Sequence, residues 1–272
     1  MRSNQRKFLF EWQSFVAAMG LMSRIPAHWI SFGALNKEHH HRAQIWYPAV
    51  GLILGSVIVF LGLAAPSHWH EFLTAALILT LWTALTGALH IDGLADTADA
   101  WVGGMGNRKR TLDIMKDPTS GPIGVTTVVL CLVGKCALIT QLLAQHQILP
   151  LMLVPMLARA WLLPLIANLP YARASHEEQP GGMANAISQG LPKCAALISF
   201  ILVYVITLVV LVVGNNDLVT FVALILFSGF TCFLIYRQTK QRLGGYTGDI
   251  LGASVELQEL TLLFALALFI AD

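Results

Sequence analysis

The sequence predicts an all-α, polytopic integral membrane bundle of about seven transmembrane helices with an N-terminal interfacial helix. Apolar residues make up 56% of its 272 positions and charged residues only 12%, about half the charged share of a typical soluble domain. The mean hydropathy of +0.67 agrees with this composition. No stretch has the composition of a separate soluble domain, so we expect residues 1–272 to form one membrane-embedded domain.

Seven apolar runs are long enough to cross a bilayer, which takes about 20 helical residues. The N-terminal segment 8–22 is not among them, because basic residues flank it on both sides. It resembles a signal peptide, but polar residues interrupt it and no small-residue cleavage pattern follows. We therefore expect it to be an amphipathic helix in the membrane interface. The seven runs are Ile45–Ala65, Phe72–Leu89, Ile123–Leu143, Leu149–Leu169, Ala195–Val213, Leu218–Tyr236 and Leu251–Ala271.

The basic residues indicate the orientation of these helices. Fifteen of the 17 lysines and arginines lie before the first run or in the loops after the second, fourth and sixth runs, and the other three loops have none. The positive-inside rule then places the basic loops in the cytoplasm and the C-terminus outside. We expect a multi-pass protein of the bacterial inner membrane whose active site faces the cytoplasm. We expect it to contact the lipid bilayer and not to bind nucleic acid.

Two groups of residues with metal-binding side chains lack the spacing of a metal site. The four cysteines, Cys131, Cys136, Cys194 and Cys232, lie mostly inside apolar runs and are expected to be reduced core residues. The run 39–41 holds three consecutive histidines in an expected polar loop, and consecutive side chains cannot all face one point in regular structure. Neither group predicts a metal centre.

Three carboxylates follow the second apolar run at helical spacing. Asp92, Asp96 and Asp99 are spaced i, i+4, i+7, so on a helix they share one stripe with neighbouring Cβ atoms about 6 Å apart. Like charges repel unless a cation lies among them, and oxygen ligands at a membrane surface suit Mg²⁺, which also bridges to substrate phosphates. This pattern favours a membrane-embedded phosphoryl-type transferase. The alternative is a solvated acidic helix end.

Two basic residues lie near the middle of apolar runs. Lys135 and Arg159 stand at similar depth on consecutive antiparallel runs, where a charge costs on the order of 3 kcal/mol or more. They could form a cationic wall for a diphosphate or an acidic substrate group. Alternatively, they are structural partners of buried carboxylates such as Glu256.

Two further stretches combine glycines with polar residues. In the stretch 113–122, Ser120 or its neighbour Thr119 could cap the next helix, whose exposed amides would bind an anion; a plain Pro/Gly turn explains the pattern equally well. In the stretch 244–259, Asp249 and Glu256 are seven residues apart and share a helical face. Glu256 is either a metal ligand or general base, or the counter-ion of an intramembrane cation.

Five segments together resemble one enzyme family. They are Arg24-Ile-Pro, Trp46-Tyr-Pro-Ala-Val-Gly-Leu-Ile-Leu-Gly55, His90-Ile-Asp-Gly-Leu-Ala-Asp-Thr-Ala-Asp99, Met115-Lys-Asp-Pro-Thr-Ser-Gly-Pro-Ile-Gly124 and Gly244-Gly-Tyr-Thr-Gly-Asp-Ile-Leu-Gly-Ala253. In this combination and order the chain is similar to the cobalamin synthase family of adenosylcobinamide-GDP ribazoletransferases. The resemblance covers residues 15–259, nearly the whole sequence.

The resemblance implies a Mg²⁺-dependent membrane enzyme that joins adenosylcobinamide-GDP to α-ribazole, or to its 5′-phosphate, and releases GMP. Its metal ligands would be Asp92, Asp96 and Asp99, and its catalytic residues Asp249, Glu256, Lys135 and Arg159. The lower base, the number of Mg²⁺ ions and a homo-oligomeric state stay open. The residues expected to bind substrate are Arg24, His90, Lys116, Asp117, Ser120, Gly121 and Thr247.

Two other classes of membrane protein share some of these features. A CDP-alcohol phosphotransferase also carries Asp-Gly-x-x-Ala on a membrane helix, but its pattern expects another Asp before that element, where His90 and Ile91 stand, and an Arg at the position of Asp96. A secondary transporter would show paired half-repeats and polar groups at the midplane, whereas no internal repeat is found and the acids cluster at one surface.

Overall fold

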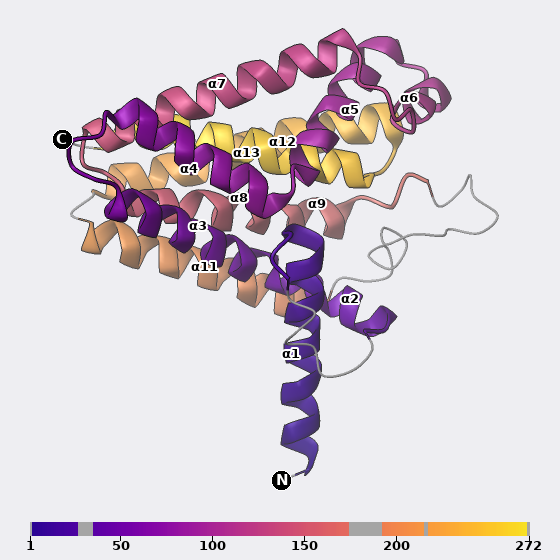
Figure 1. Cartoon of the computed structure of the whole chain (residues 1–272). Helices are drawn as coiled ribbons and strands as arrows, with labels where there is room; N and C mark the ends of the chain where they lie inside the picture. The colour runs from indigo at the N-terminus through magenta and orange to yellow at the C-terminus, as the bar shows by residue number, and fades with distance from the viewer. Residues whose placement is uncertain (1, 27–34, 174–191, 215–216, 271–272) are drawn as a thin grey trace.

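The computed structural model describes residues 2–26, 35–173, 192–214 and 217–270, and these ranges are almost entirely helical (Figure 1). Within them the β-type pairing consists of an isolated bridge between Tyr171 and Tyr246. The helices are α1 (Arg2–Met22), α2 (Lys37–Ala43), η2 (Gln44–Trp46), α3 (Tyr47–Ala64), α4 (Glu71–Thr86), α5 (Leu89–Gly103), α6 (Arg108–Ile114), α7 (Pro122–Ala144), η3 (Leu149–Met152), α8 (Leu153–Ala160), α9 (Leu162–Asn168), α11 (Lys193–Val213), α12 (Leu218–Leu243) and α13 (Gly248–Phe269).

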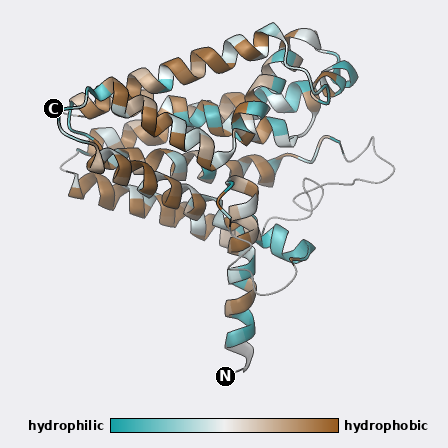
Figure 2. Ribbon diagram, in the orientation of Figure 1, coloured by the Kyte–Doolittle hydropathy of each residue, from teal (hydrophilic) through white to brown (hydrophobic). Residues whose placement is uncertain are grey.

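The prediction of an all-α, multi-pass membrane protein is confirmed. Among the described residues, six helical segments are long and apolar enough to cross a membrane, or seven if the bent pair α4–α5 is one span. Apolar residues dominate the bundle helices, and polar residues gather on α2, α6 and parts of α5 (Figure 2). The central helix is α13, which is largely buried, whereas α11 exposes apolar residues such as Ile198 and Val213 along its length.

The second predicted span differs from the structure. Instead of one helix over Phe72–Leu89, α4 ends at Gly87, which has the left-handed φ of +61° that glycine adopts without steric cost. The chain then turns by 87° into α5. The acidic stripe therefore lies on a separate helix at one end of the bundle and not on the continuation of a spanning helix.

Two other spans differ in detail. The first is continuous with α2 and η2 and covers Lys37–Ala64. The expected polar loop around the three histidines is therefore wrong: this segment is helical, and His39 caps α2, its Nδ1 accepting from the Asn36 amide at 3.0 Å. The fourth span begins with η3, which runs directly into α8, and it is interrupted at Trp161 between α8 and α9. Pro155 and Pro164 lie near this break and lack the amide hydrogen that a continuous helix needs. The four cysteines form no disulfide; Cys131 and Cys232 are buried and Cys136 is half-buried, whereas Cys194 is exposed, so its prediction as a core residue is wrong.

The N-terminal helix α1 runs across the direction of the bundle helices (Figure 1). The placement of this helix in the membrane interface stays a prediction. Glu11 anchors it: its carboxylate pairs with Arg42 at 2.7 Å and accepts a hydrogen bond from the Trp46 indole at 3.1 Å. Buried apolar residues such as Val16 and Met19 pack the C-terminal half of α1 into the core.

Candidate active site

The acidic helix α5 packs closely on the start of α13. A Cβ atom at Gly93 would lie 2.7 Å from the backbone oxygen of Asp249, and one at Gly252 would lie 3.3 Å from the Cα atom of His90. Glycine at both positions therefore lets the two helix backbones approach. Their crossing brings Asp92 and Asp96 of α5 to the same end of the bundle as Asp249, which follows them by about 150 positions in the chain.

These carboxylates form an acidic cluster. Asp96 lies within electrostatic range of Asp92, Asp99, Asp249 and the Arg173 guanidinium. Arg173 donates a hydrogen bond to Asp249 Oδ2 at 3.0 Å, and both side chains are about one-fifth exposed. Asp92 is exposed and Asp96 half-buried, so an incoming ligand can reach the cluster.

Arg173 is held in place by a short backbone pairing. The Ala172 amide donates to the Tyr246 oxygen at 2.8 Å, and the Tyr246 amide donates to the Pro170 oxygen at 2.9 Å. Burial, with Tyr171 nearby, raises the pKa of the Tyr246 phenol to about 12, so Tyr246 packs as a neutral group. The segment after α9 is thereby fixed beside the start of α13.

Asp99, the third residue of the predicted stripe, binds the start of α7. Its carboxylate accepts hydrogen bonds from the Gly121 amide at 2.6 Å and the Gly124 amide at 2.8 Å. The predicted anion site at these amides is therefore filled by the protein's own carboxylate. As a metal ligand Asp99 stays a prediction, because each carboxylate oxygen has a second lone pair.

The cluster fits a hard cation that keeps part of its water shell. Among the described residues, no three His, Cys, Asp or Glu side chains stand close enough to form a complete metal cage. Mg²⁺ does not need one, since it is usually held by one or two carboxylates together with waters and substrate phosphates. Asp92 and Asp96 supply oxygen donors only, the type that Mg²⁺ prefers.

The loop between α6 and α7 carries four predicted substrate residues: Lys116, Asp117 and Ser120 are exposed, and Gly121 is half-buried. Asp117 Oδ1 accepts hydrogen bonds from the Thr119 amide at 2.9 Å and the Thr119 hydroxyl at 2.5 Å. These bonds hold the pKa of Asp117 below its usual value. Lys116 also lines a cavity of about 200 Å³, together with Lys109, Leu112, Asp113 and Arg173.

Three other predicted substrate residues make structural contacts. Thr247 is buried and caps α13: its hydroxyl oxygen accepts from the Ile250 amide at 3.2 Å. His90 is buried where α5 packs against Gly252 of α13, and its Nδ1 has no hydrogen-bond partner among the described residues. Arg24 is exposed and lies against Gly87 at the break between α4 and α5.

The predicted catalytic residues Lys135, Arg159 and Glu256 meet deeper in the bundle. Lys135 Nζ lies 2.6 Å from both Glu256 Oε2 and Glu259 Oε2, and Arg159 Nη1 lies 3.0 Å from Glu259 Oε1. All four side chains are at least 95% buried. The contacts correspond to the counter-ion alternative, since both cations are neutralised by carboxylates of α13. A catalytic role for these residues stays a prediction.

Sequence reasoning did not assign Arg173 or Glu259 to the site. Arg173 stood out only as a basic residue after the fourth apolar run. Glu259 had a usable signal: it lies three residues after Glu256 in an apolar run, so the two acids share a helical face and match the two intramembrane cations in number.

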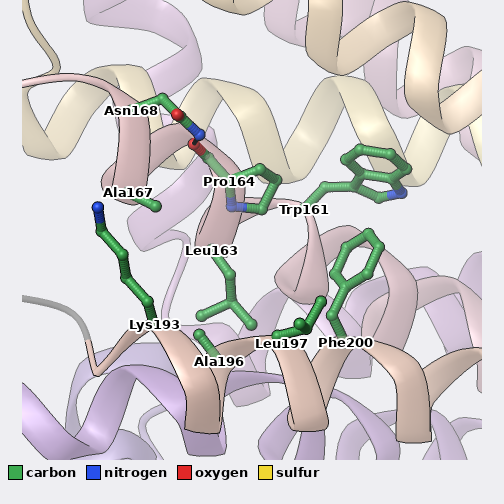
Figure 3. Close-up of a pocket in the computed structure, with 9 residues that line it drawn as sticks. All are labelled: Trp161, Leu163, Pro164, Ala167, Asn168, Lys193, Ala196, Leu197 and Phe200. Carbon is green, nitrogen blue, oxygen red and sulfur yellow. Dashed lines mark hydrogen bonds between the residues drawn. The ribbon is translucent and has the colours of Figure 1, made fainter.

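A separate cavity of about 410 Å³ lies between α9 and α11. Figure 3 shows the apolar side chains of Trp161, Leu163 and Phe200 around it, with Lys193 and Asn168 toward one end. None of the predicted site residues lines this cavity, so it is distinct from the acidic cluster.

Comparison with known proteins supplies independent information. The family model for cobalamin-5-phosphate synthase matches residues 14–267. Three curated relatives, all named adenosylcobinamide-GDP ribazoletransferase, come from Stutzerimonas stutzeri (44% identity; 84% of this chain, 87% of the relative), Pseudomonas fluorescens (41%; 87% and 92%) and Pseudomonas aeruginosa (41%; 94% and 98%). No solved structure matches the chain.

Proposed function

The chain belongs to the cobalamin-5-phosphate synthase family, and from this premise we propose a specific reaction for it. The enzyme is an adenosylcobinamide-GDP ribazoletransferase of cobalamin synthesis. In the proposed reaction, a hydroxyl of α-ribazole or of its 5′-phosphate attacks the phosphorus that joins cobinamide to GMP. A new P–O bond forms to the ribazole, the P–O bond to GMP breaks, and the hydroxyl proton leaves to a base or to water.

The observation that carries this proposal is the meeting of α5 and α13. Phosphoryl transfer needs groups that bind metal and groups that neutralise phosphate oxygens at one place. Asp92 and Asp96 supply oxygen donors, and Arg173 contributes a cation that already contacts Asp249. These residues come from three chain segments and converge only in the folded protein.

We assign the metal to Asp92 and Asp96. When bound there, Mg²⁺ would stabilise negative charge on the diphosphate and on the departing GMP. Asp99 uses both of its oxygens to cap α7, so we assign it first to position the loop that precedes α7. A role for Asp99 as a third metal ligand stays a prediction, because each oxygen keeps a second lone pair.

The remaining roles follow from position. Asp249 lies beside the acidic stripe and is held by Arg173 and by the Thr247 hydroxyl, which donates to it at 3.3 Å. We assign it to orient the attacking hydroxyl and accept its proton. Lys116, with Asp117 and Ser120 in the exposed loop, is assigned to the guanosine diphosphate end of the donor.

We place this site on the cytoplasmic side of the bacterial inner membrane, with the C-terminus outside. Three basic residues from different connecting segments meet at this end of the bundle: Arg108 donates to the Ala172 oxygen at 3.0 Å, Arg242 to the Trp101 oxygen at 2.6 Å, and Arg173 to Asp249. Their grouping supports the positive-inside assignment.

The test is GMP release by the purified protein in detergent, supplied with adenosylcobinamide-GDP, α-ribazole and Mg²⁺. Asp92→Ala is compared with Glu71→Gln, which changes an exposed acid at the far end of α4. We expect the wild type and Glu71→Gln to form GMP and a cobalamin product in a Mg²⁺-dependent reaction. We expect Asp92→Ala to form neither. Absence of GMP from folded wild-type protein would overturn the reaction, and full activity of Asp92→Ala would overturn the metal assignment.

A further inference from the structure

We propose that Glu259 is a positioning residue, which joins Lys135 and Arg159 to α13 and thereby holds Asp249 in the orientation that the proposed reaction requires. This inference rests on the proposed function for its catalytic readout. In this proposal Lys135 and Arg159 do not touch the substrate. They act on the reaction by fixing the position of α13.

The first support is the geometry of the buried cluster. Glu259 uses both carboxylate oxygens, one on Lys135 at 2.6 Å and the other on Arg159 at 3.0 Å. Glu256 contacts Lys135 at 2.6 Å. Glu259 is thus the residue through which the two cations are connected, and it links α7 and α8 to α13.

The second support is charge balance. Two cations and two carboxylates share a region in which each side chain is at most 5% exposed. Buried charges of this kind are tolerated when they are paired, and removal of one partner leaves a charge without compensation. Since Lys135 and Arg159 are both neutralised within the protein, the cluster has no excess positive charge for a diphosphate.

The third support is the path from this cluster to the acidic site. Asp249 and Glu256 are seven residues apart and lie on one face of α13, so a rotation of the helix that displaces Glu256 also turns Asp249. Near Asp249, α13 is packed against Gly93 of α5 without space for a Cβ atom. The Lys135 side chain also lies 5.3 Å from the Trp82 ring of α4, which extends the connection to a fourth helix.

The same contacts also fix the position of α7, which carries the loop of the candidate site at its start. Lys135 is on α7, the helix whose first turn is capped by Asp99. The charge cluster therefore sets how α7 and α13 lie relative to one another, and with them the loop before α7 and the acid at the start of α13. A positioning role explains why these charges are buried below the site and not exposed within it.

The test is a double-mutant cycle on Arg159→Met and Glu259→Gln, with the doubly substituted protein and with Glu71→Gln as a surface control. Arg159→Met leaves Glu259 with Lys135 alone, and Glu259→Gln leaves Arg159 without a carboxylate, whereas the double variant removes one cation and one anion and keeps the Lys135–Glu256 pair. Melting temperature in detergent, kcat for GMP release, and the Mg²⁺ concentration for half-maximal activity are measured for each.

We expect each single variant to melt at lower temperature and, in its folded fraction, to need at least threefold more Mg²⁺. In the double variant both quantities should return toward the wild type, with kcat at least tenfold above that of the worse single variant. If the double variant is no more active than Arg159→Met and its KM for adenosylcobinamide-GDP is raised, Arg159 contacts the substrate directly and the positioning role is overturned.

A fall in melting temperature without any change in Mg²⁺ requirement would reduce the cluster to a purely structural element and overturn the positioning role. If wild-type protein releases no GMP, the proposed function fails by itself. The melting temperatures then still decide whether Glu259 couples Arg159 to the fold, so the two failures are distinguishable.

Discussion

The carboxylate of Asp99 and the backbone amide of Gly121 are 2.6 Å apart, which joins the end of the acidic stripe on α5 to the first turn of α7. The amides at a helix start have no partner within the helix and carry partial positive charge, so a carboxylate there is favourable. Gly121 and Gly124 leave the space that Asp99 occupies, because a Cβ at either position would overlap its carboxylate.

The cap predicts a stability effect for Asp99→Ala. Two amides at the start of α7 lose their acceptor, so we expect a loss of about 1–3 kcal/mol in the free energy of unfolding. Thermal melting in detergent measures it. The Mg²⁺ concentration for half-maximal GMP release should stay close to that of the wild type, and a tenfold increase would instead identify Asp99 as a metal ligand.

The close crossing of α5 and α13 predicts that Gly93→Ala impairs activity. The added Cβ would lie 2.7 Å from the Asp249 backbone oxygen, so the helices must separate and the acids of α5 move away from Asp249. We expect the rate of GMP release to fall by about tenfold or more. A tenfold fall corresponds to an increase of about 1.4 kcal/mol in the activation free energy. Gly20→Ala is the matched control, since its added Cβ has no described neighbour within 4 Å beyond its own helix turn. Equal rates for the two variants would argue against the crossing as a determinant of the site.

The pair formed by Arg173 and Asp249 predicts a loss of activity that exceeds any loss of stability. Partly exposed ion pairs contribute about 0–1 kcal/mol to folding, so Arg173→Met should melt within a few degrees of the wild type. GMP release should nevertheless fall at least about tenfold, because Asp249 loses its cation beside the reacting groups. Lys240→Met serves as the control, because Lys240 is exposed and, within the described part of the chain, its ammonium group contacts Tyr236 of the same helix. Unchanged kinetics in Arg173→Met would remove Arg173 from the site.

Removal of divalent cations should abolish the reaction without unfolding the protein. The proposed metal would bind at exposed Asp92 and half-buried Asp96, at one end of the bundle, so its removal should leave the packing of the spanning helices intact. We expect EDTA to stop GMP release, Mg²⁺ to restore it, and the melting temperature to change little. Activity that persists in excess chelator would contradict a metal-dependent site.

Most of the fold was predictable because the length and polarity of an apolar run are local properties of the chain. The spans from α7 to α13 occur near their expected residues, and the acidic stripe is helical. The bend at Gly87 was not predicted, since a glycine within an apolar run is compatible with a straight helix, whereas the turn of 87° depends on how α5 packs against α13 and α7. The helical histidine segment was missed because its polar residues resemble a loop.

For the site, the sequence by itself determined which charged residues exist, which of them share a helical face, and which lie within apolar runs. Only the tertiary structure decided how they are paired: Asp99 with the amides of α7, Asp249 with Arg173, and the intramembrane cations with Glu256 and Glu259. The physical reason is that each of these partners lies more than 20 residues away along the chain. Charge and helical periodicity are properties of the local sequence, whereas the counter-ion of a charged residue depends on which helices pack together.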